Sequence, residues 1–195
     1  QKFNTVKILD EIENPRNSIF EEYDNLIKFH EFNSKIITDK APQNFLWIGF
    51  IKIFFPGSKI IHCSRNPKDN CLSIFKNYFS SKTMHWAYDQ KSIAEYYILY
   101  SNLMDFWKSK FNEDIYEANY EKIVNSPEIE VKKMLSFCDL DWEPDCLNFH
   151  KNRKTPVQTI SISQANKPIY KSSVNSYEPF AEYLSDMFKI IDYNL

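Results

Sequence analysis

Stretches with helical spacing of apolar residues alternate with short apolar runs along this chain. The helical stretches start beside capping residues or prolines and are predicted over about 18–33, 44–55, 68–79, 93–111, 127–138, 142–149 and 179–191. The short apolar runs predict strands at 35–38, 59–63 and 114–119. Strands that alternate with helices favour an α/β fold with a mainly parallel central sheet flanked by helices.

Hydrophobicity separates some of these elements from the rest. The helix at 44–55 is apolar nearly all round, so we expect it to be buried. The strand at 59–63 is apolar on both faces, as in the centre of a parallel sheet. Residues 151–178 are polar and include Pro156 and Pro168, which predicts a long loop before the last helix.

Length and charge narrow the class of protein. A chain of 195 residues favours one domain over 1–195, and a hydrophobic fraction of 43% is enough for a core. Lys and Arg number 24 against 26 Asp and Glu, and this net charge of −2 argues against a nucleic-acid partner. No apolar run reaches the roughly 20 residues that a membrane span needs.

Cysteine, histidine and glycine limit the kinds of site. The cysteines lack a Cys-x-x-Cys pair and the histidines lack ligand spacing, so we expect no metal. Reduced thiols, and therefore a cytoplasmic protein, are favoured. The 195 residues include only two glycines, Gly49 and Gly57. The sequence therefore contains neither a Gly-x-Gly-x-x-Gly turn nor a Walker loop.

An arginine and a serine near one strand end suit a phosphate group. Arg65 follows the strand at 59–63, and Ser73 lies eight residues later in the first turns of the next helix. Ligands of parallel sheets bind beyond the carboxyl ends of the strands. A guanidinium fork and free helix N–H groups both bind phosphate. The alternative is a surface salt bridge between Arg65 and Asp69.

Other polar residues follow the remaining predicted strands. Lys40 comes just after 35–38 and could neutralise charge that develops on a phosphoryl or sulfuryl group, although a solvated loop lysine is the alternative. Tyr120 ends the strand at 114–119, where it could lie against a nucleotide or pack under the sheet edge. The polar loop adds hydrogen-bond donors: Ser161, Gln164 and Lys167.

Taken in order, these segments resemble the sulfotransferase family. The matching segments are Asp-Lys-x-Pro-x-Asn-Phe (39–45), Phe-Pro-x-x-Lys-Ile-Ile-His-Cys-x-Arg-x-Pro-x-Asp-x-Cys-Leu-Ser (55–73), Tyr-Glu-x-Ile-Val (120–124) and Thr-x-Ser-x-x-Gln-x-x-Lys-Pro-Ile-Tyr (159–170). The resemblance covers about 36–190. It is strongest to bacterial members fused to tetratricopeptide repeats, which are related to tyrosylprotein sulfotransferases. It implies a P-loop-NTPase-like fold.

The resemblance also implies a reaction. The family transfers a sulfuryl group from 3′-phosphoadenosine 5′-phosphosulfate (PAPS) to a hydroxyl or amine acceptor, here a small molecule, a glycan or a protein tyrosine. By resemblance, the roles are as follows: Arg65 and Ser73 hold the 3′-phosphate, Tyr120 contacts the nucleotide, Lys40 and Ser161 assist transfer, and Ser161, Gln164 and Lys167 belong to the loop that closes over the nucleotide.

Two departures from the family pattern bear on activity. A Pro-Arg-Ser-Gly-Thr-like loop for the 5′-phosphosulfate is not found in these residues, and Pro42 occupies the place of the histidine that cytosolic members use as a base. Ser176 also stands where relatives often carry a basic residue. We expect the loop and the base to precede Gln1, so that the chain is the C-terminal portion of a truncated domain.

Other functions remain open at this point. The chain could be a non-catalytic nucleotide-binding module, or an inactive fragment, that binds adenosine 3′,5′-bisphosphate. A P-loop kinase relative would share the sheet, but the pair of Arg65 and Ser73 favours a sulfotransferase.

Overall fold

Two parallel strands, β1 (Ile60–Ser64) and β2 (Ile115–Asn119), form the sheet in the described part of this protein. Ile60 lies opposite Ile115, so the carboxyl ends of both strands meet at one edge. The computed structural model describes residues 21–22, 25, 36–151 and 167–195. Its two compact units, 1–58 and 59–195, are considered separately.

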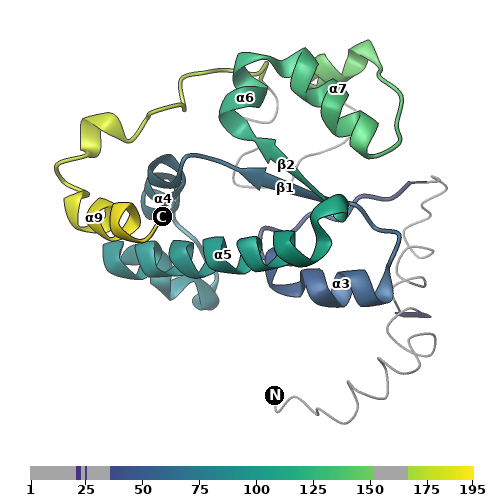
Figure 1. Cartoon of the computed structure of the whole chain (residues 1–195). Helices are drawn as coiled ribbons and strands as arrows, with labels where there is room; N and C mark the ends of the chain where they lie inside the picture. Colours follow the sequence, from purple (N-terminus) through teal and green to yellow (C-terminus); the bar gives the residue numbers. More distant parts are fainter. Residues whose placement is uncertain (1–20, 23–24, 26–35, 152–166) are drawn as a thin grey trace, which may run out of the picture. The chain divides into compact units, whose positions relative to one another are not determined.

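Helices cover both faces of the sheet in the 59–195 unit (Figure 1). The connection from β1 to β2 runs through α4 (Pro67–Phe75) and α5 (Gln90–Phe111), and α5 lies along one face of the sheet. α6 (Tyr120–Asn125) and α7 (Pro127–Phe137) lie on the opposite side. The predicted α/β fold with a parallel, helix-flanked sheet is therefore confirmed.

The apolar core of this unit lies between α4, α5 and α9 (Ser185–Asn194), which packs along α5. Cys71, Ile93 and Met187 are fully buried there. Burial raises the pKa of the Cys71 thiol to about 12, consistent with a packing role. Because these helices are held by a shared core, the start of α4 has a fixed place against the rest of the unit.

In the 1–58 unit, the 3₁₀ turn Asn44–Trp47 leads into α3 (Ile48–Phe54). Lys52 lies on the buried face of α3, and its Nζ donates hydrogen bonds to the carbonyl oxygens of Pro56 (2.6 Å) and Ser58 (2.8 Å). These bonds satisfy the buried ammonium group at the end of the helix.

Two sequence predictions in this unit are wrong. Residues 36–38 do not form the expected strand: they have no regular secondary structure, and Ile36 is 54% exposed, so this apolar run lacks the pairing and burial that a strand needs. The expected all-round burial of 44–55 also fails, because Trp47 (45%) and Ile53 (43%) are exposed. The helix predicted at 18–33 lies mostly outside the described residues.

Other boundaries differ because side chains and tight turns interrupt the helices. α4 ends at Phe75 rather than 79, where the side-chain amide of Asn77 donates to the carbonyl of Ser73. α6 was not predicted, although Asn119 caps it by accepting from the backbone N–H of Lys122. The last helix starts at 185 rather than 179, after a 3₁₀ turn. The 3₁₀ turns of this unit are Lys82–Tyr88, Asn112–Asp114, Pro144–Leu147, Phe149–Lys151 and Glu178–Phe180, and two of them replace the helix predicted at 142–149.

β1 also differs in burial from the expectation. Its exposure alternates along the strand, and Ile61 is 41% exposed and Cys63 is exposed. One face of the strand is thus half-buried in the described structure and the other is exposed, instead of both being buried.

Candidate functional site

The turn from β1 into α4 holds Arg65 between a strand end and a helix start. Asn66 is the N-cap of α4, and its side chain accepts hydrogen bonds from the backbone N–H groups of Lys68 (2.9 Å) and Asp69 (3.2 Å). Pro67 occupies the first helical position, where its missing N–H costs nothing. The Asn-Pro pair therefore starts the helix directly after Arg65.

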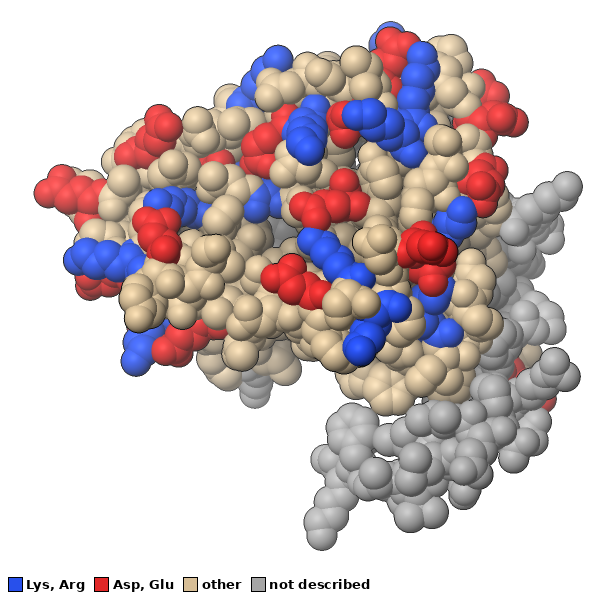
Figure 2. Space-filling view, viewed as in Figure 1, with Lys and Arg blue, Asp and Glu red and all other residues tan. Residues whose placement is uncertain are grey.

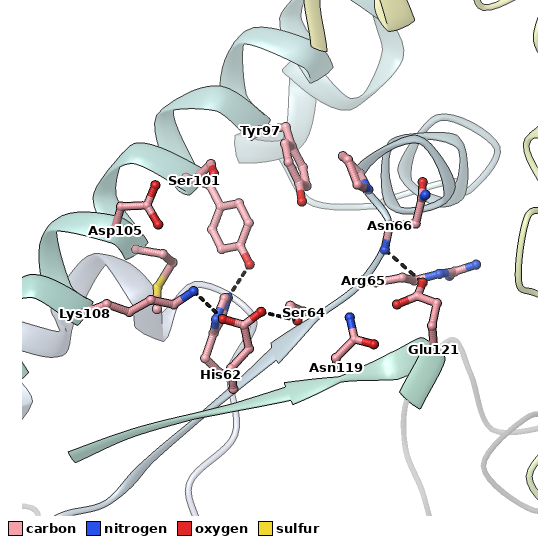
Figure 3. A pocket seen from close by; sticks show the side chains of 14 residues that line it. His62, Ser64, Arg65, Asn66, Tyr97, Ser101, Asp105, Lys108, Asn119 and Glu121 are labelled. Atoms are coloured by element: carbon pink, nitrogen blue, oxygen red, sulfur yellow. Dashed lines mark hydrogen bonds and ion pairs between the residues drawn. The ribbon is translucent and has the colours of Figure 1, made fainter. Parts of the chain in front are cut away.

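The end of β2 contacts this turn through both residues of the Tyr-Glu pair. The guanidinium carbon of Arg65 lies 4.9 Å from the centre of the Tyr120 ring, a cation–π distance. Glu121 accepts a hydrogen bond of 2.9 Å from the backbone N–H of Asn66 (Figure 3). The two strand ends are thereby tied together around Arg65.

A segment more than a hundred positions later in the sequence completes the surroundings of Arg65. Nη2 of Arg65 donates a hydrogen bond of 2.5 Å to the backbone carbonyl of Ser173 in this segment. Asp69 is fully buried and accepts three hydrogen bonds, from the backbone N–H groups of Asn175 (2.8 Å) and Tyr177 (3.0 Å) and from the hydroxyl of Ser176 (2.8 Å). Asn175 has a φ of 56°, a left-handed conformation that asparagine tolerates.

The ion pair considered between Arg65 and Asp69 is present, but as a long contact to a buried carboxylate and not as a surface salt bridge. Nη2 of Arg65 lies 4.0 Å from Oδ1 of Asp69, beyond hydrogen-bond distance, and Asp69 is buried rather than on the surface. The carboxylate instead binds the 175–177 segment.

The guanidinium retains unused donors. Among the described residues, Nε of Arg65 is buried and has no hydrogen-bond partner. A buried donor without a partner costs about 1–3 kcal/mol. A bound anion that accepted from Nε would remove this cost, and phosphate oxygens suit a guanidinium best. In Figure 3 the side chain of Arg65 points away from the side chains of α5.

A cavity of about 450 Å³ lies between the sheet and α5, with Arg65 and Asn66 among its lining residues (Figure 3). Side chains in its wall are paired with each other. His62 hydrogen-bonds the Tyr100 hydroxyl, and Glu117 pairs with Lys108 and accepts from the Ser64 hydroxyl at 3.0 Å.

Electrostatics in this wall follow from the same pairs. Burial, with Lys108 nearby, lowers the pKa of His62, which favours the neutral imidazole. The hydrogen bond from Lys108, together with that from Ser64, lowers the pKa of Glu117. The charged groups of the wall are thus largely compensated, whereas the Arg65 guanidinium keeps a free donor.

Of the residues predicted for the site, Arg65 and Tyr120 are brought together. Ser73 lies about two turns into α4, half-buried, where it neither lines the cavity nor hydrogen-bonds Arg65. Lys167 is exposed at the start of the second long described segment.

The other predicted residues lie elsewhere. Lys40 belongs to the 1–58 unit and is exposed, in a segment without regular structure. Ser161 and Gln164 lie outside the described residues.

Sequence reasoning named Asp69 only as a possible ion-pair partner of Arg65, and it missed the other contacts by which Asp69 and Glu121 build this site. Asp69 stands three residues after the N-cap, a place where an acid usually turns back to its own helix. Glu121 was noted only as part of the Tyr-Glu pair. Local sequence gave no sign of their partners, because Asp69 binds residues 175–177 and Glu121 binds residue 66.

Charge over the rest of the visible surface is mixed. On the face seen in Figure 2, the coloured basic and acidic side chains are interspersed. In the described part of the chain, no cluster of three His, Cys, Asp or Glu side chains could hold a metal ion. Nor does any described helix combine the length and apolarity needed to cross a membrane.

Comparisons with known proteins identify the family and the fold of the chain. A family model described as "Sulfotransferase family" matches residues 8–144. The chain is 36% identical over 157 residues to an uncharacterised protein of Aquifex aeolicus (strain VF5), covering 80% of this chain and 20% of that protein. The chain therefore spans about one fifth of the length of that relative.

Among solved structures, the fold is similar to the "Sulfotransferase Domain from the Curacin Biosynthetic Pathway". The TM-score is 0.63 at 15% identity, and the likeness covers 92% of this chain and 72% of that one. At this identity the likeness shows a shared fold, the P-loop-like α/β fold that the sequence predicts.

Proposed function

Because this chain belongs to the sulfotransferase family, we propose that it forms the donor-binding part of an enzyme that uses PAPS. The reaction is transfer of the sulfuryl group to a hydroxyl or amine acceptor. In this proposal Arg65 binds the 3′-phosphate of the nucleotide, and Tyr120 fixes the plane of the guanidinium against which that phosphate lies.

One observation carries the proposal. Arg65 stands at the carboxyl end of a parallel strand, anchored by Ser173 and Tyr120, and yet its buried Nε lacks a partner among the described residues. Ligands of parallel α/β sheets bind at this edge. A phosphate oxygen that accepted from Nε would complete the hydrogen bonding of the guanidinium.

The remaining roles in the proposal come from the family resemblance. Ser73 joins Arg65 at the 3′-phosphate, and the segment with Ser161, Gln164 and Lys167 closes over the nucleotide. The subtype, linked to tetratricopeptide repeats and related to tyrosylprotein sulfotransferases, rests on the order of the sequence motifs alone. A single domain over 1–195 and a cytoplasmic location are expectations from composition.

Lys40 has the chemical role in this proposal. The acceptor oxygen or nitrogen attacks the sulfur and loses its proton to a base. The bond from sulfur to the bridging oxygen breaks, and its electron pair stays on the leaving 5′-phosphate. A hydrogen bond from the Lys40 ammonium to the bridging oxygen stabilises the charge that builds there in the transition state.

The test is calorimetric titration of the 195-residue chain with adenosine 3′,5′-bisphosphate. A charge-assisted contact contributes about 1.5–3 kcal/mol, so Arg65→Ala is expected to weaken binding by at least about tenfold. Lys110→Ala is the matched control, because Lys110 is an exposed cation of α5 that does not line the cavity. Affinity that is the same in Arg65→Ala, or a folded wild type that does not bind, would overturn the proposal.

A further inference from the structure

Asp69 is the most deeply buried charged side chain among the described residues, and the proposed function gives it no contact with a ligand. All three of its hydrogen bonds come from residues 175–177. Its own helix does not use it, because Asn66 caps the first turn of α4. A buried carboxylate that accepts hydrogen bonds from a distant segment holds that segment in place, because each of these polar groups would lose its partner if the segment moved away.

The held segment is the one that anchors Arg65. Ser173 lies two residues before Asn175, and its carbonyl accepts from Nη2 of Arg65. Residues 172–177 form consecutive turns without a helical or strand ladder of their own. The position of the Ser173 carbonyl therefore depends on the bonds that Asp69 makes just beyond it.

We propose that Asp69 is a positioning residue for recognition of the 3′-phosphate. By holding residues 175–177, it sets the Ser173 carbonyl that binds one edge of the Arg65 guanidinium. Nε makes no hydrogen bond with a described residue and stays available for the phosphate. The inference rests on the proposed function, since it assigns the 3′-phosphate to Arg65.

Preorganisation explains why such a residue affects affinity. Tyr120 restricts the plane of the guanidinium, and Ser173 restricts its rotation within that plane. An arginine held in both ways loses little side-chain entropy when a phosphate binds. If the 173–177 segment is released, Arg65 has to be ordered by the ligand itself. The contribution of the 3′-phosphate to nucleotide affinity then falls, whereas the contributions of the other nucleotide groups stay the same.

The experiment compares two nucleotides that differ in this phosphate, adenosine 3′,5′-bisphosphate and adenosine 5′-monophosphate, by calorimetry. The quantity of interest is the ratio of their dissociation constants, because a general loss of stability changes both affinities together. Asp69→Asn keeps the shape but turns an N–H donor group toward the 175–177 donors. We expect it to reduce the preference for the bisphosphate about tenfold.

Asp192→Asn is the matched control. Asp192 also joins the C-terminal part of the chain to α4, through an ion pair of 2.8 Å with Lys68, but its side chain is 59% exposed and its recorded partner among the described residues is Lys68, not the 173–177 segment. The nucleotide preference of this variant is expected to equal that of the wild type.

The outcomes separate the two proposals. A folded wild type without preference for the bisphosphate overturns the proposed function and this inference with it. A preference that is present in the wild type and unchanged in folded Asp69→Asn overturns this inference alone. If Asp69→Asn does not fold, Ser176→Ala decides, because it removes one of the three bonds and is expected to reduce the preference about threefold. An unchanged preference in Ser176→Ala then overturns the inference.

Discussion

Two cations that the family resemblance assigns to one reaction, Arg65 and Lys40, have very different surroundings. Arg65 is anchored by a backbone carbonyl, lies against an aromatic ring and neighbours a buried carboxylate. Lys40 lies in the exposed segment 36–40 and forms no hydrogen bond or ion pair with another described residue. Next to Lys40 in the sequence, Asp39 accepts a hydrogen bond of 3.4 Å from the side-chain amide of Asn44.

The difference fits two different tasks. A residue that binds the ground state of a nucleotide gains from being ordered before the ligand arrives. A residue that acts on the bridging oxygen needs to meet its target only in the transition state. We therefore expect Arg65 to control donor affinity and Lys40 to control turnover.

The largest expected effect is the loss of turnover in Lys40→Ala. The variant is made in a longer protein that includes this chain. Loss of the ammonium removes charge stabilisation at the bridging oxygen, so turnover is expected to fall by about two orders of magnitude or more. Affinity for the donor changes little. The measurement is release of adenosine 3′,5′-bisphosphate from PAPS with a panel of phenols, alcohols and amines as acceptors.

Lys91→Ala is the control for Lys40, because Lys91 is also exposed and pairs only with Glu95 on the surface of α5 among the described residues. Its turnover is expected to match the wild type. Equal turnover in Lys40→Ala and Lys91→Ala would remove Lys40 from the reaction. A wild type that binds the nucleotide but releases none from PAPS with any acceptor would instead favour a non-catalytic binding module.

A smaller effect, on the free energy of unfolding, is expected from Asn66→Ala. This variant tests whether the turn that carries Arg65 depends on the N-cap of α4. The variant removes the acceptor for two backbone N–H groups at the start of α4. The free energy of unfolding is expected to fall by about 1 kcal/mol, as for other N-caps. Urea denaturation at constant pH measures the change.

Asn70→Ala provides the comparison on the same helix, since the Asn70 side chain forms no hydrogen bond with another described residue and its backbone N–H donates to the carbonyl of Asn66. We expect its unfolding free energy to change by less than about 0.5 kcal/mol. If both variants lose the same stability, the cap does not fix the turn that carries Arg65.

Sequence pattern alone predicted the parts of the fold with strong local signals. The helix expected at 93–111 is observed as Gln90–Phe111, and the helix expected at 127–138 is observed as Pro127–Phe137. The strand expected at 114–119 is observed as Ile115–Asn119. In each case a cap, a proline or a turn of the chain sets the end, and such signals lie within a few residues of the element itself.

The site was harder to predict, because its geometry depends on long-range contacts. The phosphate interpretation of Arg65 used its position after a strand and the hydroxyl of Ser73 in the first turns of the next helix. The role proposed for Asp69 depends on residues 106 to 108 positions away, and no periodicity reports such a partner. The failure at 36–38 has the same origin, since an apolar run forms a strand only when another strand pairs with it.

The smallest expected effect concerns pH and the strand that carries Arg65. Burial lowers the pKa of His62 in the folded state below its ordinary value of 6.5. The unfolded chain therefore binds more protons than the folded chain as the pH falls through about 6.5, and the free energy of unfolding decreases there. The loss stops once the pH is below the folded-state pKa.

Urea denaturation at pH 7.5 and at pH 5.5 measures this loss, and we expect it to be smaller than the effect of removing the Asn66 cap. His62→Gln is expected to reduce the difference between the two pH values, because glutamine does not titrate. His85→Gln is the control, since His85 is exposed in the turn Lys82–Tyr88 and its variant should keep the wild-type difference. If the free energy of unfolding in His62→Gln still falls between pH 7.5 and pH 5.5 as in the wild type, other titratable groups cause the pH dependence. The stability of β1, the strand that leads to Arg65, would then not depend on the charge of His62.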